Sequence, residues 1–237
     1  MDKLKRRETM SPIEAISFDY DGTLANTISA MKEATKMIIK NISSVTGISY
    51  NELHKQFTLI SEHFSRKGNY NRHLWIKETL KHFNINMKDH EIVKLVREYW
   101  GFVAKNTRLY DEAMEVLVQL KRKGYMVAIL TNTDGSYGIK RRRILKVFPK
   151  NFFDAIIVAG DDTEEPKPHV EAFYMLAKTL NVEPEKIMHV GDDYLTDIVG
   201  GLKAGVLPVL ISRESKFPKV AKNIIAIRSL RELLMYL

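Results

Sequence analysis

From Leu109 onward, short apolar runs alternate with amphipathic stretches, and this alternation constrains the fold more than any other feature of the chain. The apolar runs predict strands at 126–131, 155–158, 186–190, 207–211 and 224–227. The amphipathic stretches predict helices at 111–123 and 170–180. Repeated strand–helix units of this size favour a parallel, doubly wound sheet, so the sequence predicts an α/β fold.

Residues 27–105 have a different character. Their apolar positions recur at helical spacing, and they contain few runs of β-branched residues. Asn26 and Thr27, just before them, are residues that can cap a helix. We therefore predict two domains: a core of residues 1–26 and 106–237, and an inserted helical domain of residues 27–105.

A first buried strand is predicted at residues 13–18, and it ends abruptly at two carboxylates, Asp19 and Asp21. Burying carboxylates there costs on the order of several kcal/mol unless a cation or hydrogen-bond donors compensate. A hard divalent cation with oxygen ligands is the obvious compensator. One of the two carboxylates is then free to act as a nucleophile.

Three further polar clusters lie beyond predicted strands. They are Thr131 with Asn132, then Lys167 within a Glu-Pro-Lys-Pro segment, then Asp192, Asp193 and Asp197. Taken singly, they could be a turn, a solvated loop lysine and a helix cap. Ligands of doubly wound sheets bind beyond the carboxyl ends of the strands, so the shared placement predicts one site.

The four clusters, in this order, resemble the four motifs of the haloacid dehalogenase (HAD) superfamily. The matching segments are Asp19-Tyr20-Asp21-Gly22-Thr23, Ile129-Leu130-Thr131-Asn132, Lys167-Pro168 with Phe173, and Asp192 with Asp197. The resemblance covers about residues 13–211. It implies a Rossmann-like doubly wound parallel sheet core with an inserted α-helical cap domain, and residues 27–105 occupy the place of that cap.

The resemblance also implies roles for the two carboxylates of the first motif. Asp19 would attack phosphorus and form an aspartyl-phosphate. Asp21 would protonate the leaving oxygen and then activate the hydrolytic water. Dehalogenases of the superfamily generally lack an acid at the position of Asp21, so its presence favours a phosphatase similar to phosphoglycolate phosphatases.

The remaining motif residues are assigned by the same resemblance to phosphate and metal. The phosphoryl oxygens would be held by Thr131, Asn132 and Lys167, with help from nearby backbone amides. Magnesium (Mg2+) would be bound by Asp19, the main-chain carbonyl of Asp21, and Asp192, with support from Asp193 and Asp197. Electrostatics supports this assignment of roles. A cation must lie between an attacking carboxylate and a phosphate, because the two repel each other, and lysine provides a point charge for phosphate.

Two alternatives to a phosphatase stay open. A phosphomutase shares the aspartate pair and a comparable helical cap. A non-catalytic module could instead use the basic surface to bind anions or nucleic acid, since the formal net charge is +8. The densest basic runs, 3–7 and 140–143, are expected to be a frayed terminus and a solvated helix face. No nucleic-acid-binding motif accompanies them, which makes nucleic acid an unlikely partner. The partner that the resemblance implies is a small phosphorylated metabolite.

The substrate itself cannot be read from the sequence, because the cap is expected to select it. Arg66, Lys67 and Arg72, in and beside a polar loop between predicted cap helices, are candidates for recognising an acidic substrate. The oligomeric state is not determined by the sequence either.

The composition excludes several other classes of protein. The chain has no cysteine, which excludes disulfides and thiolate chemistry. Its charged N-terminus has no apolar signal core, and no apolar run approaches the length of a membrane span. The expected location is cytoplasmic.

Overall fold

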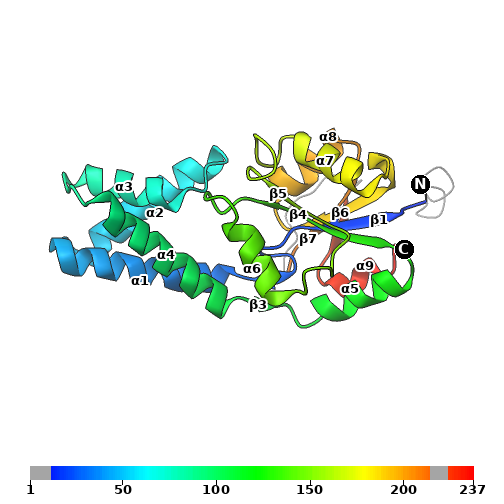
Figure 1. Ribbon diagram of the computed structural model, residues 1–237, viewed down its shortest axis with the longest axis horizontal. Coiled ribbons are helices and arrows are strands. Elements are labelled where there is room, and N and C mark those ends of the chain that lie inside the picture. Colours follow the sequence, from blue (N-terminus) through cyan, green and yellow to red (C-terminus); the bar gives the residue numbers. More distant parts are fainter. Residues whose placement is uncertain (1–11, 214–223) are drawn as a thin grey trace. The chain divides into compact units, whose positions relative to one another are not determined.

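The computed structural model describes residues 12–213 and 224–237, and it forms two compact units (Figure 1). The first unit contains the chain up to Ala25 together with Leu109–Asn132 and Phe148–Leu237. The second unit contains Asn26–Arg108 and Thr133–Val147. The sequence had suggested a helical domain of residues 27–105 alone, whereas the structure groups 133–147 with it.

The first unit is built on a six-stranded sheet with the strand order β5-β4-β1-β6-β7-β8. Every neighbouring pair is parallel, as the alternation of strands and helices predicted. The strands are β1 (Ala15–Phe18), β4 (Met126–Asn132), β5 (Ala155–Ala159), β6 (Ile187–Gly191), β7 (Leu207–Ile211) and β8 (Ile225–Ile227). This confirms the predicted fold class.

Helices cover both faces of this sheet (Figure 1). They are α5 (Ala113–Arg122) and α9 (Leu230–Leu233) on one face, and α7 (Glu171–Leu180) and α8 (Gly200–Lys203) on the other. Phe173 and Leu176 of α7 pack with Leu130 and Ile157 of the sheet. Because both faces are covered, the central strand β1 is buried along its whole length.

The second unit is helical, as predicted for residues 27–105. Its helices are α1 (Ile28–Thr46), α2 (Tyr50–Arg66), α3 (Arg72–His82), α4 (Asp89–Asn106) and α6 (Ile139–Val147). Its apolar core includes Ile38, Trp75 and Trp100. Gly135, in the loop before α6, lies so close to the main chain of Tyr70 and Asn71 that no Cβ would fit there.

Two very short strands, β2 (Ala25–Asn26) and β3 (Arg108–Leu109), pair with each other in a second sheet. They lie where the chain passes from one unit to the other. A two-residue strand leaves no periodicity in the sequence, so this pairing was not predicted.

The expectation of a solvated helix face for residues 140–143 was wrong for two of them. Lys140 and Arg143 on α6 are only 5% and 4% exposed. The carboxylate of Asp134 compensates both, because it lies 2.9 Å from the Lys140 Nζ and accepts two hydrogen bonds from the Arg143 Nη1, at 3.0 and 2.8 Å. The other basic run, 3–7, lies outside the described residues.

Within residues 12–213 and 224–237, no helix is both long enough and apolar enough to cross a membrane.

Candidate functional site

Three adjacent strands of the sheet, β4, β1 and β6, bring the predicted site residues to one edge. Asp19 follows β1, Asp192 follows β6, and Thr131 and Asn132 are the last residues of β4. Parallel strands end at the same edge, so the structure places these motifs side by side. The backbone N–H of Asp19 donates to the carbonyl of Val190 at 2.8 Å, which fixes the start of the loop after β1 against β6.

The Gly-Thr pair of the first motif shapes the surroundings of Asp192. Gly22 has a φ of +89°, and a Cβ at this position would collide with the Asp192 carboxylate. The Thr23 hydroxyl donates to Asp192 Oδ1 at 3.1 Å. These two residues therefore hold the fourth motif against the first, while Asp21 lies partly exposed in the same turn.

Lys167 occupies the centre of the site and is 1% exposed. Its Nζ donates to Asp19 Oδ1 at 3.0 Å, to Asp197 Oδ1 at 2.6 Å and to the Leu130 carbonyl at 2.9 Å. All three ammonium hydrogens thus have an acceptor. Burial lowers the pKa of Lys167, but the charges of Asp19 and Asp197 outweigh it and raise the pKa above its usual value. The side chain is therefore a fixed positive charge beside Asp19.

Asp197 is equally buried and anchors Lys167. Besides the Lys167 ammonium, it accepts a hydrogen bond from the backbone N–H of Asp193 at 3.0 Å. Burial alone raises the pKa of Asp197, but the Lys167 charge and the hydrogen bond from His189 bring it well below its usual range. Gly191 makes room for this carboxylate, because a Cβ there would collide with it.

Asn132 positions Lys167 from the other side. Its Oδ1 accepts from the Lys167 backbone N–H at 2.8 Å, and its Nδ2 donates to the Lys167 carbonyl at 3.2 Å. The side-chain amide is therefore engaged with the Lys167 main chain. Its role as a phosphate ligand stays a prediction, as does that of the buried Thr131.

Asp193 caps the π-helix formed by Tyr194–Val199, where its side chain accepts from the backbone N–H of Thr196 at 2.7 Å. Taken singly, the cluster of Asp192, Asp193 and Asp197 suggested a helix cap, and in the structure Asp193 is the residue that caps the helix. Support of a metal by Asp193 stays a prediction.

Asp192 is an exposed residue, but its carboxylate lies against Gly22 and accepts from the Thr23 hydroxyl, so protein encloses it in part. This enclosure and the negative charges of Asp19 and Asp197 raise the pKa of Asp192 to about 8. The site thus gathers more negative charge than Lys167 alone balances.

The donor set fits a magnesium ion, because carboxylate and main-chain oxygens are the ligands that this ion prefers. Within the described part of the chain, no group of three or more His, Asp and Glu side chains is arranged to hold a metal. The predicted site requires only two carboxylate side chains, those of Asp19 and Asp192, together with the Asp21 carbonyl. Magnesium usually retains several waters, so such a sparse protein contribution is typical.

Sequence reasoning missed Ser17 and His189, which lie beneath the site. They are register partners on β1 and β6, and the Ser17 Oγ lies 2.9 Å from His189 Nδ1. His189 Nε2 lies 3.2 Å from Asp197 Oδ1. Burial lowers the pKa of His189, which favours the neutral form of the ring. The Asp197 carboxylate can only accept, so Nε2 donates to it and Nδ1 accepts from Ser17.

Replacing His189 by Phe is expected to lower kcat by roughly tenfold to a hundredfold, because Asp197 loses a donor that orients it toward Lys167. The Gln variant, whose amide can still donate to Asp197, is expected to retain more activity. Steady-state kinetics of both variants, with thermal unfolding as a control for folding, checks this. Equal kcat values in the Phe variant and the native chain would contradict a positioning role.

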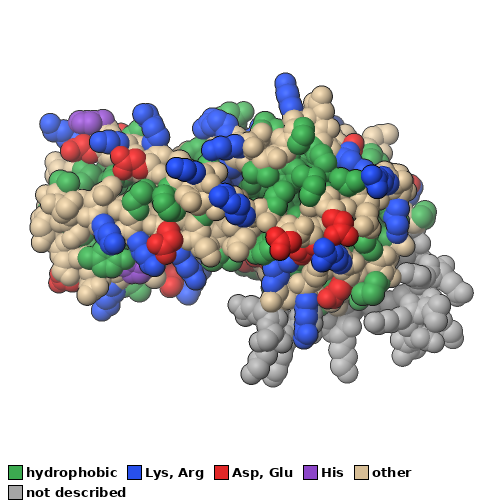
Figure 2. Space-filling view, turned by 90° about the horizontal axis from the view of Figure 1, so that it is seen from below, with side chains coloured by type: hydrophobic (Ala, Val, Ile, Leu, Met, Phe, Trp, Pro, Cys, Tyr) green, Lys and Arg blue, Asp and Glu red, His purple; other side chains and the backbone are tan. Residues whose placement is uncertain are grey.

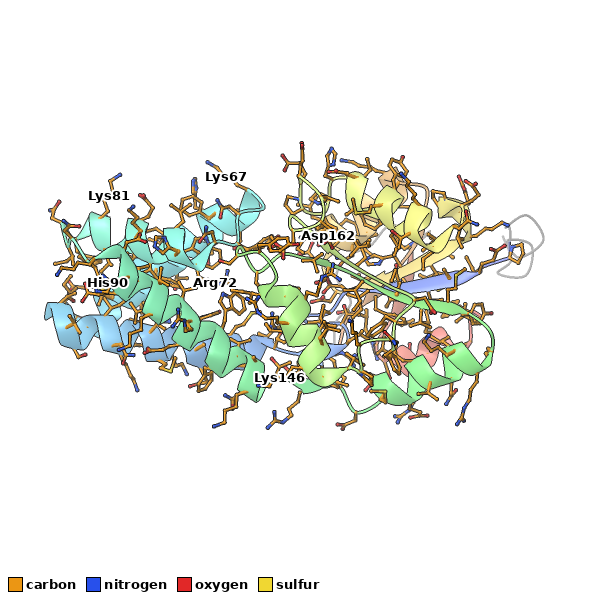
Figure 3. All side chains as sticks on the ribbon, viewed as in Figure 1. Lys67, Arg72, Lys81, His90, Lys146 and Asp162 are labelled. Carbon is orange, nitrogen blue, oxygen red and sulfur yellow. The ribbon has the colours of Figure 1, made fainter. Side chains whose placement is uncertain are left out.

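The three basic residues proposed to read an acidic substrate differ in the structure. Arg72 is buried, and its guanidinium carbon lies 3.8 Å from the ring centroid of Trp75. Its Nη1 donates to the Tyr70 carbonyl at 3.0 Å. Arg66 and Lys67 are exposed, and Lys67 points outward from the helices (Figure 3). Arg72 therefore supports the helical packing, and only the other two are presented to solvent.

Known proteins are similar to this chain over the region that contains the four motifs. A family model described as haloacid dehalogenase-like hydrolase matches residues 13–205. The N-acylneuraminate-9-phosphatase of Homo sapiens is 30% identical over 218 residues, which cover 83% of this chain and 81% of that protein. The glyceraldehyde 3-phosphate phosphatase of Pyrococcus furiosus is 29% identical over 205 residues, with coverage of 84% and 81%. The crystal structure of a HAD phosphatase from Thermococcus onnurineus has a TM-score of 0.71 at 25% identity, and covers 94% of this chain and 97% of that chain.

Proposed function

The chain belongs to the haloacid dehalogenase-like hydrolase family, and we propose that it is a magnesium-dependent phosphatase acting through an aspartyl-phosphate. The observation that carries this proposal is the buried Lys167, which holds Asp19 at the carboxyl edge of the sheet beside Asp192. The phosphatases similar to this chain bear the names of different substrates, so their names support a small organic phosphate without identifying it.

In the first step, a carboxylate oxygen of Asp19 attacks phosphorus, and the bond between phosphorus and the leaving oxygen breaks. Asp21, in its protonated form, gives its proton to that oxygen, so an alcohol leaves. Lys167 and Thr131, with backbone amides near Tyr20, hold the oxygens of the transferring group. Positioning and charge neutralisation of this kind supply most of the catalysis of phosphoryl transfer.

In the second step, the Asp21 carboxylate takes a proton from a water molecule, which attacks the phosphorus of the aspartyl-phosphate. The bond between phosphorus and Asp19 then breaks. Inorganic phosphate is released, the Asp19 carboxylate is restored, and Asp21 is again protonated for the next cycle.

Magnesium would be held by Asp19, the Asp21 carbonyl and Asp192. When bound, it supplies the positive charge that allows a carboxylate and a phosphate to approach each other. The raised pKa of Asp192 supports this assignment, because burial and the negative charges of Asp19 and Asp197 disfavour its ionised form, and a divalent cation would offset both effects.

We further propose that the helical residues 27–105 act as a cap that selects the substrate. The motif residues of the core recognise only the phosphoryl group and the metal, which all substrates share. Selection must then come from groups that touch the leaving portion. Arg66 and Lys67, which are exposed at the end of α2, are suited to a carboxylate or a second phosphate.

The test of the proposed function is phosphate release from p-nitrophenyl phosphate with and without chelator. Activity is expected to fall by roughly a hundredfold or more in excess EDTA and to return when magnesium is added. Protons compete with the metal for Asp192, so the apparent magnesium affinity is expected to rise with pH up to its pKa of about 8.

Calorimetric titration with magnesium at several pH values measures that affinity directly. Full activity in chelator would overturn the metal requirement. Conversion of a sugar phosphate into its isomer, with no phosphate released, would assign the chain to the phosphomutases.

A further inference from the structure

A groove of about 680 Å³ lies within the helical unit, between α4 and α6 and beside the start of α3. All of its lining residues belong to the second unit. We call it the α4–α6 groove. Its volume is in the range of pockets that hold small organic molecules. None of the residues assigned to phosphoryl transfer lines it.

One stripe of each helix faces the groove. On α4 the stripe is Val93, Val96, Arg97, Trp100, Gly101 and Ala104, and on α6 it is Ile139, Arg142, Arg143 and Lys146. These positions recur every three or four residues, so they share one helix face. Small residues leave the space open, because a Cβ added to Gly101 would meet no other atom within 4 Å.

Three cations of this groove are uncompensated. Arg97, Arg142 and Lys146 are exposed, and none forms an ion pair with an acidic residue in the part of the chain that the structure describes. Lys146 stands near the end of α6 (Figure 3), and Lys and Arg side chains are spread across the face shown in Figure 2. Arg143 pairs with Asp134, and Asp89, an acidic residue that lines the groove, has its Oδ1 2.8 Å from His73 Nε2, so the three exposed cations outnumber it. The groove therefore attracts anions.

The groove also offers an apolar floor. Val93 is 41% exposed although it is apolar. Trp100 also lines the groove and is 5% exposed. An occupant with an apolar portion would cover this exposed apolar surface.

We propose that the α4–α6 groove binds a small organic phosphate that carries at least two negative charges and an apolar or aromatic portion, such as a nucleoside diphosphate. The charges pair with Arg97, Arg142 and Lys146, and the apolar portion covers Val93 and Trp100. This ligand site shares no residue with the proposed phosphatase site, and binding there does not depend on turnover.

The experiment is isothermal calorimetry on the full chain carrying Asp19→Asn, in chelator, so that turnover does not interfere. The probes are ADP, which has both features, inorganic pyrophosphate, which has only the charge, and adenosine, which has only the apolar portion. We expect ADP to bind most tightly of the three probes. Its affinity is expected to fall as the salt concentration is raised. Equal affinity for ADP and either partial probe would overturn the proposed ligand class.

Two variants test the location. Replacing Arg97, Arg142 and Lys146 together by Ala is expected to weaken ADP binding by roughly tenfold or more. Gly101→Leu fills the groove without changing its charge and is expected to weaken ADP binding as well. Circular dichroism confirms that each variant is folded.

The matched control replaces three other exposed lysines of the helical unit, Lys77, Lys94 and Lys105, by Ala. It makes the same change in net charge, and these residues do not line the groove. Retained ADP binding in this control supports the proposal. An equal loss in both triple variants, or native affinity in the groove variants, would overturn it. Binding is measured without turnover, so the ADP affinity tests the groove even if the chain shows no phosphatase activity.

Discussion

Asp19→Asn is expected to lower phosphatase turnover by roughly 10⁴-fold or more. The amide of Asn cannot attack phosphorus, and it replaces the carboxylate whose Oδ1 accepts from Lys167 Nζ at 3.0 Å. The variant should still fold, because its amide oxygen can accept from Lys167 and Asp197 keeps its own bond to that lysine. Single-turnover and steady-state assays of phosphate release measure the loss.

Two neighbouring variants serve as comparisons. Asp21→Asn is expected to slow hydrolysis by about 10²–10⁴-fold, the usual contribution of general acid–base catalysis, and to let phosphoenzyme accumulate. Asp193→Asn is expected to have a small effect, because its side chain caps a helix and an amide oxygen can still accept from Thr196. Native turnover in the Asp19 variant would require a different nucleophile.

Lys167→Met is expected to abolish activity and to lower the free energy of unfolding by about 3–5 kcal/mol. The methionine side chain is of similar length, but it leaves Asp19 and the fully buried Asp197 without their shared cation. An uncompensated buried carboxylate is strongly unfavourable, and part of the cost will be relieved by protonation of Asp197. Urea denaturation at neutral and at acidic pH measures both effects.

The sign of the pH dependence follows from Asp197. In the native chain its pKa is held below the usual range, so the stability it contributes is present above the unfolded pKa and is lost as the pH falls. In Lys167→Met that contribution disappears, so the gap in stability between the two chains should narrow in acid.

The double variant Lys167→Met with Asp197→Asn separates folding from catalysis. Removing the stranded charge should restore part of the stability but none of the activity. A control is Lys186→Met, which removes an exposed lysine that lies 2.7 Å from Glu14, and should change stability little. A loss in Lys167→Met no larger than in this control would contradict the central role of the buried lysine.

The strands and their polar ends could be predicted because each signal is local. An apolar run followed by Asp-x-Asp-Gly predicts both the end of β1 and the turn beyond it, and the predicted strand 207–211 coincides with β7. Parallel topology then brings the ends of separate strands to one edge without further information.

Side-chain partners distant in sequence could not be predicted in the same way. The compensation of Lys140 and Arg143 by Asp134 depends on how α6 folds back on its preceding loop, so a basic run alone suggests a solvated face. The pairing of Ser17 with His189 did leave a trace, since each is the polar residue of a short, buried strand. Two such residues on neighbouring central strands are a usable signal for a buried hydrogen-bond pair.

The grouping of residues 133–147 with the helical unit has a consequence for exchanging modules between relatives. A chimera that replaces only residues 27–105 would keep the native α6 and its loop, in which Gly135 fits closely against the main chain of Tyr70 and Asn71. A foreign segment at 70–71 with a different backbone would clash there or leave a void. The module that can be exchanged is therefore discontinuous. A chimera should take residues 26–108 and 133–147 from the same relative.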